Sequence, residues 1–244
     1  GRKKLEKLYS DYSKKKIEPV NFWSDAINLL NIQIINSSKN ILNIPSEGPL
    51  IIIANHPFGI IDGLILCSIT SKFRKDFKIL THETLQFIPE LNEFILPIEF
   101  NDTDKEKIRQ NIITTQKARK HLNSKGALII FPSGSVSVAR SLKSAAKDDK
   151  WKLFPAKLIQ QTKSNVLPIF FDGKNGFLFH LFASKLKSPT LKYSSYIHET
   201  RKKIGKSINI YPGNLIRYSD LENIKDRKKL TNHLKKITYN LKDN

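Results

Sequence analysis

One stretch of the chain constrains the fold more than any other: an apolar run, rich in β-branched residues, that breaks off at a histidine. Residues 50–54 read Leu-Ile-Ile-Ile-Ala, which is typical of a strand buried on both faces. The run stops at Asn55, His56 and Pro57, and a second apolar run at 64–69 is better suited to a helix. We therefore expect a buried strand, a sharp bend and a helix, in that order.

The bend carries two side chains suited to general-base chemistry, His56 and Asp62. A carboxylate bonded to one imidazole nitrogen fixes the tautomer and leaves the other nitrogen free to accept a proton. In one continuous helix these side chains would lie about 240° apart, so they can meet only if the backbone turns back. Pro57 and Gly59 supply the residues that such a turn needs. A plainer interpretation stays open, in which His56 ends the strand and Asp62 only caps the helix.

Asn55-His56 through Asp62 resembles the NHxxxxD motif of the lysophospholipid and glycerolipid acyltransferase superfamily. The chain departs from that motif, because five residues separate the histidine from the aspartate here and four are usual. The variant His-Pro-Phe-Gly-x-x-Asp-Gly is similar to a soluble bacterial hemolysin-like branch, related to acyltransferases of phospholipid and ornithine-lipid synthesis. The resemblance implies that His56 is the general base, that Asp62 orients it, and that Asn55 and Gly59 help to bind substrate.

A second loop, at 132–137, follows the predicted strand 127–131 and is rich in serine. Its backbone N–H groups and hydroxyls could hold an anion, and a plain connecting turn is the alternative. The loop stands where the family has its FPEGTRS phosphate-binding motif, with Ser133 and Val136 in place of the usual glutamate and arginine. Downstream, Arg140 is the candidate for the missing cation. The resemblance therefore implies further substrate-binding residues, namely Ser133, Gly134, Ser135 and Arg140.

Strand and helix patterns alternate along the chain. Apolar runs predict strands at 50–54, 77–80, 95–99, 127–131, 166–171 and 207–211. Apolar stripes predict helices at 2–16, 21–36, 155–162 and 177–186. Capping-box spacing predicts two longer helices, one beginning at Thr103 and one, at the C-terminus, beginning at Ser219. This alternation indicates an α/β fold with a central, largely parallel mixed sheet flanked by helices, similar to the glycerolipid acyltransferases.

No repeat, linker or clear domain boundary interrupts the pattern, so we expect residues 1–244 to form a single acyltransferase-like domain. Residues 1–45 would be a helical N-terminal arm and residues 46–244 the α/β core. Ligands bind α/β sheets at the carboxyl ends of the strands, so the loops that follow three buried strands should meet at one site. These loops lie at 55–59, 132–137 and 172–176.

The formal net charge of +20 favours an anionic partner: phosphate groups, an anionic membrane surface, acyl carrier protein or nucleic acid. Part of this charge is also what an AT-rich coding sequence would produce, because the chain is crowded with Lys, Asn and Ile. Its aromatic residues lack the pattern of an RNA-recognition sheet, so no specific nucleic acid is expected. The basic helix at 2–16 is either a solvated arm or a membrane contact, and Phe22 and Trp23 could enter lipid headgroups.

Other classes of site have little support. The chain has no G-x-S-x-G elbow, P-loop, G-x-G-x-x-G or metal-binding histidine spacing, so we predict no bound metal or cofactor. The single Cys67 excludes an intrachain disulfide, and a thiol in an apolar run stays protonated and is a poor nucleophile. No signal peptide and no membrane-spanning run is recognisable. We expect a cytoplasmic protein, peripheral on the membrane.

The resemblance and the dyad together predict an acyltransferase that moves a fatty acyl group from acyl-CoA or acyl carrier protein to a lysophospholipid or related lyso-lipid. Lysophosphatidate, another lysolipid and a lyso-ornithine lipid are all open as acceptors. Two alternatives stay open: a non-enzymatic basic protein that binds anionic lipid or nucleic acid, and a hydrolase of acyl thioesters or esters on the same site. The sequence predicts no oligomeric state.

Overall fold

The structure is a computed structural model that describes residues 2–14, 18–38, 42–82, 88–98, 104–139, 141, 143–177, 179–180 and 189–243. Seven strands of the described chain form one sheet in the order β1-β7-β6-β2-β5-β3-β4. The β6–β7 pair is antiparallel and the other neighbouring pairs are parallel. The strands are β1 Gln33–Asn36, β2 Leu50–Ala54, β3 Phe77–Thr81, β4 Ile95–Pro97, β5 Ala127–Ile130, β6 Asn165–Asp172 and β7 Ser207–Pro212. The expected largely parallel mixed sheet is confirmed.

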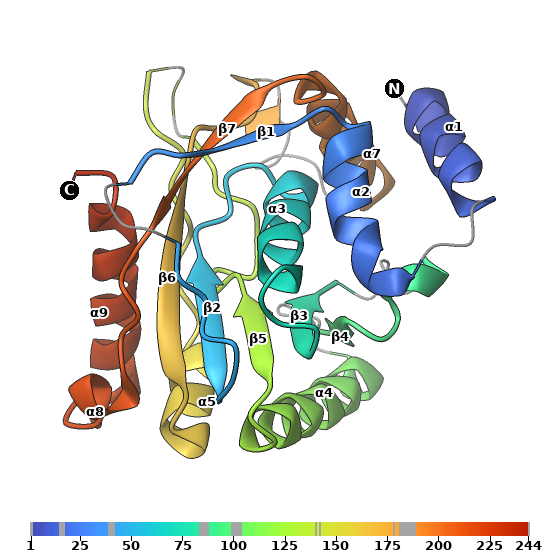
Figure 1. Cartoon of the computed structure of the whole chain (residues 1–244). Coiled ribbons are helices and arrows are strands. Elements are labelled where there is room, and N and C mark those ends of the chain that lie inside the picture. The colour runs from blue at the N-terminus through green and yellow to red at the C-terminus, as the bar shows by residue number, and fades with distance from the viewer. Residues whose placement is uncertain are drawn as a thin grey trace.

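Helices cover both faces of the sheet, and Figure 1 looks onto the face covered by α2 and α3. The α-helices are α1 Arg2–Ser13, α2 Phe22–Leu29, α3 Ile60–Ser71, α4 Lys105–Asn123, α5 Phe154–Thr162, α7 Pro189–Lys202, α8 Tyr218–Leu221 and α9 Arg227–Asn240. There are also two short 3₁₀ helices: η1 Pro19–Asn21, directly before α2, and η3 Pro89–Leu91, between β3 and β4. Among the described helices, none is long and apolar enough to cross a membrane.

Strand β2 lies inside the sheet and all five of its residues are buried. Its side chains alternate between two cores, as the pleat of a strand requires. Leu50 and Ile52 pack in the core on the side of α2 and α3, whereas Ile51 and Ile53 pack with residues of α4, α5 and α9. A continuous apolar run is what a parallel strand covered on both faces needs. The strand that precedes the histidine is therefore fixed by its surroundings on every side.

The predicted helix at 21–36 is half right. Helix α2 ends at Leu29, and Asn31 has a φ of +48°, a left-handed conformation that asparagine tolerates better than most residues. The chain then turns, and Ile34 lies in the edge strand β1, where it pairs with Ile208 of β7. The N-terminal region therefore adds a strand to the sheet, which the prediction of a helical arm missed.

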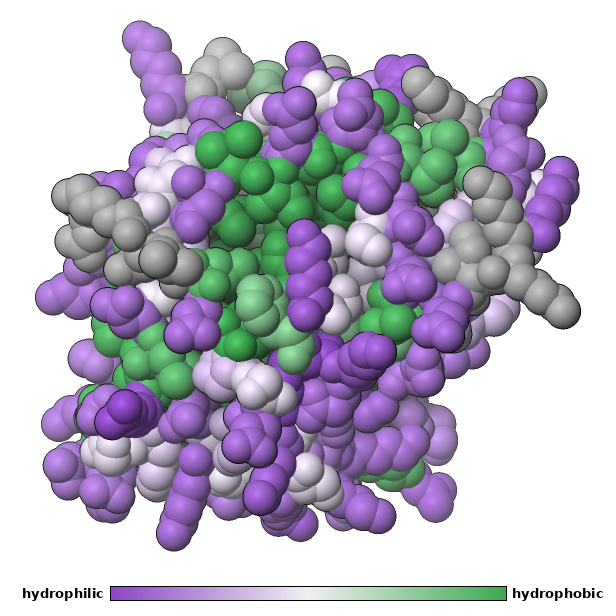
Figure 2. All heavy atoms as spheres, in the orientation of Figure 1, coloured by the Kyte–Doolittle hydropathy of each residue, from purple (hydrophilic) through white to green (hydrophobic). Residues whose placement is uncertain are grey.

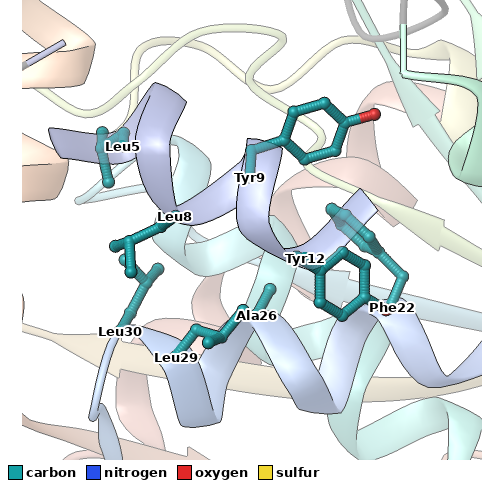
Figure 3. Close-up of a pocket in the computed structure, with 8 residues that line it drawn as sticks. All are labelled: Leu5, Leu8, Tyr9, Tyr12, Phe22, Ala26, Leu29 and Leu30. Atoms are coloured by element: carbon teal, nitrogen blue, oxygen red, sulfur yellow. The ribbon is translucent and has the colours of Figure 1, made fainter. Parts of the chain in front are cut away.

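Helices α1 and α2 enclose a shallow hollow with an apolar lining (Figure 3). Its lining residues are Leu5, Leu8, Tyr9 and Tyr12 on the side of α1, and Phe22, Ala26, Leu29 and Leu30 on the side of α2. Phe22 and Trp23 are buried, and Trp23 packs edge-on against Phe77 and Phe94. The suggestion that Phe22 and Trp23 reach lipid headgroups is therefore wrong. These aromatic residues anchor the N-terminal helices to the core.

Three further expectations about helices need correction or lie outside the described residues. Helix α9 begins after Asp226, whose carboxylate accepts a hydrogen bond from the Lys229 N–H, and does not begin at Ser219. Asp104 caps α4 in the same way, and Thr103 is not described. Of the predicted helix at 177–186, only 177, 179 and 180 belong to the described residues. Asp, like Ser and Thr, is a strong N-cap, so the capping-box pattern alone selected the wrong residues.

Candidate active site

The three loops expected to share a site do meet. Strand β2 lies between β5 and β6, parallel to both, so the three carboxyl ends face the same edge of the sheet. The Ser137 N–H donates to the His56 carbonyl oxygen over 2.8 Å, which joins the loops after β2 and β5. A Cβ atom at Gly173, in the loop after β6, would lie 2.5 Å from the Phe58 ring. These contacts place all three loops around residues 55–59.

His56 and Asp62 form the dyad that the bend was expected to allow. The His56 Nδ1 lies 3.0 Å from the Asp62 Oδ2, and their side chains are 18% and 0% exposed. The same carboxylate oxygen accepts the N–H groups of Phe58 and Gly59 over 2.8 and 2.9 Å. The carboxylate thus holds both the imidazole and the backbone turn between the two residues. The five-residue spacing is compatible with a dyad because this turn closes on Asp62.

Gly59 permits the turn through its own backbone. Its φ is +82° and its ψ is −114°, a combination that residues with a side chain rarely adopt. A Cβ atom there would also lie 3.2 Å from Val136 and 3.4 Å from Tyr196, so the loop after β5 and helix α7 approach it closely. Predicted to bind substrate, Gly59 serves in this structure to shape the bend.

Asp62 is buried at an energetic cost. Its Oδ1 has no hydrogen-bond partner among the residues that the structure describes. Burial raises the pKa of this carboxyl group, and the hydrogen bonds from His56, Phe58 and Gly59 oppose that rise. An unpaired buried polar atom costs about 1–3 kcal/mol, so the burial of this oxygen opposes folding.

The His56 ring is held on several sides. It stacks on Phe131 with 3.9 Å between ring centroids and 21° between ring planes. Its Nδ1 faces Asp62, so its Nε2 is the ring nitrogen left to exchange a proton with a bound molecule. Among the residues that the structure describes, none forms a hydrogen bond with that nitrogen, and the side chain retains some exposure. This arrangement suits a general base.

Asp148 is a residue that the sequence analysis missed. Its Oδ1 accepts the His56 backbone N–H over 3.1 Å and the Ser137 hydroxyl. Its Oδ2 accepts the Trp151 indole N–H over 2.7 Å. Tyr239 of α9 accepts the Asp148 backbone N–H over 2.8 Å. One buried carboxylate therefore fixes the backbone of the catalytic candidate, and only its place in the fold reveals this.

Most residues predicted to bind substrate form hydrogen bonds with other groups of the protein. The Asn55 amide donates to the Phe171 carbonyl oxygen over 2.9 Å and accepts the Phe171 N–H over 2.7 Å. Ser133 is buried, and its hydroxyl donates to the Ser135 carbonyl oxygen over 2.7 Å. Gly134 has a φ of +68° and donates its N–H to Phe131. These three residues shape the loops, and substrate binding by Asn55, Ser133 and Gly134 stays a prediction.

The remaining two predicted binding residues differ in what the structure says of them. Ser135 is half-buried beside the dyad loop, and Arg140 lies outside the described residues. A different cation, Lys203, lies close to the turn, with its Nζ 4.4 Å from the centroid of the Phe58 ring. Burial lowers the pKa of Lys203, and the carboxylates of Glu199 and Asp62 oppose this. No motif in the sequence identifies Lys203.

Metal chemistry has no obvious place among the residues that the structure describes. Within them, no group of three or more His, Cys, Asp or Glu side chains could hold a metal ion. Cys67 is a free, buried thiol whose pKa is raised by that burial.

Comparison with known proteins agrees with this geometry. The chain is 26% identical to a lyso-glycine lipid O-acyltransferase from Bacteroides thetaiotaomicron, over 96% of this chain and 84% of that protein. It is 24% identical to the enzyme of the same name from Phocaeicola vulgatus, over 94% of this chain and 80% of that protein. In fold it is similar to the crystal structure of PlsC, a 1-acyl-sn-glycerophosphate acyltransferase from Thermotoga maritima, with a TM-score of 0.56 and 14% identity. That match covers 93% of this chain and 78% of PlsC.

A model of the acyltransferase family matches residues 37–172, the segment that contains β2, the dyad, the loop after β5 and strand β6. This match covers more than half of the chain, and it confirms the resemblance that the histidine motif indicated. The chain therefore belongs to the acyltransferase family, within the glycerolipid acyltransferase superfamily.

Proposed function

We propose that this protein transfers a fatty acyl group from an acyl thioester, either acyl-CoA or acyl carrier protein, to the hydroxyl of a lyso-lipid. The observation that carries the proposal is the 3.0 Å contact between His56 Nδ1 and Asp62, which leaves Nε2 as the proton acceptor. In the reaction, Nε2 removes the hydroxyl proton while the oxygen attacks the thioester carbonyl carbon. Asp62 stabilises the imidazolium, which then returns the proton to the departing thiolate.

The acceptor that we favour is an amino-acid lyso-lipid, such as a lyso-glycine lipid, over lysophosphatidate. Two relatives that align over nearly the whole chain carry the name lyso-glycine lipid O-acyltransferase. Val136 stands where the family's phosphate-binding motif has its arginine, so that position of the loop carries no cation. A glycine headgroup presents a carboxylate, which one nearby ammonium such as Lys203 would balance. A phosphate carries up to two negative charges and would need more than one such cation.

The test is an assay of purified protein with a labelled long-chain acyl-CoA or acyl carrier protein and one acceptor at a time. We expect mass spectrometry to detect the acylated product with lyso-glycine lipid, and little product with lysophosphatidate. If lysophosphatidate were acylated and lyso-glycine lipid were not, the favoured acceptor would be wrong and the proposed acyl transfer would stand. Consumption of the thioester without any acylated acceptor would replace the transferase by a hydrolase on the same site.

A further inference from the structure

Three large apolar side chains are exposed on the loops that surround the dyad. Ile60 is 38% exposed and follows the bend after β2, Val138 is 36% exposed and follows the loop after β5, and Phe177 is 46% exposed and follows the loop after β6. Single exposed apolar residues are common on protein surfaces and need no explanation. Here each of the three loops that meet at the site contributes one, and we call these three residues the apolar rim.

Short contacts tie the rim to the site. Ile60 follows Gly59, which approaches both Val136 and Tyr196. Val138 is one residue beyond Ser137, whose N–H binds the His56 carbonyl oxygen. Phe177 follows Gly176, whose N–H donates to Glu199 of α7 over 2.7 Å. Figure 2 shows hydrophobic residues surrounded by hydrophilic ones on the face of the protein that α2 and α3 cover in Figure 1.

Positive charge lies on the same loops. Lys143 and Lys147 are exposed on the segment after β5, and Arg201 and Lys202 are exposed at the end of α7. Lys203, next along the chain, donates to the Lys174 carbonyl oxygen, so this end of α7 contacts the loop after β6. Nearby carboxylates are engaged within the protein: Asp148 binds three donors, Asp172 pairs with Lys242, and Glu199 pairs with Lys202.

We propose that the apolar rim docks on an anionic lipid surface and brings the dyad to acceptors held in that surface. The inference rests on the proposed function, because a lyso-lipid keeps its tail in lipid while its hydroxyl has to reach His56. Apolar side chains that enter the headgroup region, flanked by Lys and Arg that attract acidic headgroups, are the combination that binds such surfaces. The docking face is then the edge of the sheet that holds the site, and the buried Phe22 and Trp23 take no part.

The first experiment measures co-sedimentation with phosphatidylglycerol–phosphatidylcholine vesicles and with phosphatidylcholine vesicles. We expect the wild type to prefer the anionic vesicles and the triple variant Ile60→Ser, Val138→Ser, Phe177→Ser to bind them about tenfold more weakly. The matched control is Ile112→Ser, because Ile112 is 55% exposed on α4, at the far end of the sheet from the start of α3 (Figure 1). Equal binding by the triple variant and the wild type would overturn the inference and indicate binding through charge alone.

A second measurement avoids any dependence on how well the triple variant folds. Cys67 is fully buried, so a cysteine introduced as Phe177→Cys can be labelled selectively with an environment-sensitive fluorophore, and Ile112→Cys provides the control. We expect the label at position 177 to shift to the blue on addition of anionic vesicles and the label at position 112 to stay unchanged. Equal responses at both positions would overturn the inference. Neither readout requires turnover, so a failed acyltransferase assay would leave the docking result independent.

Discussion

The loop after β2 and the loop after β5 leave neighbouring parallel strands at the same edge of the sheet, yet they use their polar groups differently. In the first loop, the bend brings His56 onto Asp62 and leaves Nε2 facing away from the carboxylate. In the second loop, the Ser133 hydroxyl binds Ser135 and the Ser137 hydroxyl binds Asp148. One loop presents a reactive group, and the other closes upon itself and supports its neighbour.

Small polar residues at the end of a strand are therefore poor evidence of a binding site. Serine and glycine satisfy the backbone of a tight turn as readily as they bind a ligand. A histidine and a carboxylate that share a hydrogen bond are harder to explain structurally, because burying Asp62 costs stability. The comparison predicts large functional effects in the first loop and small ones in the second.

The largest effect is expected for His56→Ala. Removing the general base should lower the rate of acyl transfer by about 10²–10⁴-fold, because proton removal from the acceptor hydroxyl then depends on water. The backbone N–H and carbonyl contacts of His56 remain, and the loss of the ring's contacts with Asp62 and Phe131 should lower the melting temperature of a protein that still folds. Steady-state kinetics and thermal unfolding check both statements. Near-normal turnover in a folded variant would remove His56 from the mechanism.

The next effect is expected for Asp62→Asn, which removes the charge that stabilises the imidazolium. We expect acyl transfer to fall by about 10²-fold, with the affinity for the acyl thioester nearly unchanged. The measurement is the separation of kcat from KM under initial-rate conditions. A variant that loses thioester affinity and retains kcat would place Asp62 in substrate binding.

The same variant tests the direction in which burial shifts the Asp62 pKa. This pKa is raised in the folded protein. In the pH range just above the ordinary aspartate pKa, the folded protein therefore keeps a proton on Asp62 that the unfolded chain has lost. The contribution of Asp62 to stability therefore falls as the pH rises through that window, and Asp62→Asn should remove the fall. Denaturant unfolding of both proteins across the acidic range measures it. A wild-type advantage that grows with pH would show that the pKa is lowered.

An intermediate effect is expected for Asp148→Asn, because the Asp148 carboxylate links the two loops. An amide nitrogen in place of one carboxylate oxygen would face the N–H groups of His56 or Trp151, so the His56 backbone would lose its anchor. We expect kcat to fall about tenfold with KM unchanged. Trp151→Phe is the control, because it removes one donor to Asp148 and keeps the bond to His56. A lower melting temperature with unaltered kcat would limit Asp148 to a structural role.

The smallest effect is expected for Ser133→Ala in the loop after β5. Its hydroxyl is bound inside the turn, so its loss should cost about 1 kcal/mol of stability and change KM for the acceptor by less than about twofold. Chemical unfolding and acceptor titration give the two values. A large rise in KM would restore Ser133 to the binding site and weaken the contrast between the loops.

The sequence predicted the strands inside the sheet and the edge strand β4, and it missed β1 at the opposite edge. β2 and α3 could be predicted from local sequence, because a strand buried on both faces needs a continuous apolar run and the turn after it needs a glycine. β1 could not, because its four residues are mostly exposed and it exists through pairing with β7, far along the chain. Capping residues failed for a related reason: several local candidates fit the pattern, and packing selects among them.

The same reasoning separates the parts of the site. His56 and Asp62 are close in sequence and joined by turn-forming residues, so their meeting was predictable. Asp148 and Lys203 act through contacts with residues far away along the chain, and nothing in their neighbourhoods distinguishes them from other charged residues. Asn55 was expected to bind substrate, and the hydrogen bonds that hold it to Phe171 appear only when β6 is in place.

The most direct test of the account is the protonation of the His56 ring, observed by ¹⁵N nuclear magnetic resonance of histidine-labelled protein. The His56→Ala variant assigns the signals by their loss. For the uncharged ring, we predict a proton on Nδ1, bonded to Asp62, and a bare Nε2 with a free lone pair. A proton on Nε2 with a bare Nδ1 would mean that Asp62 does not orient the ring, and would contradict the role of His56 as the base.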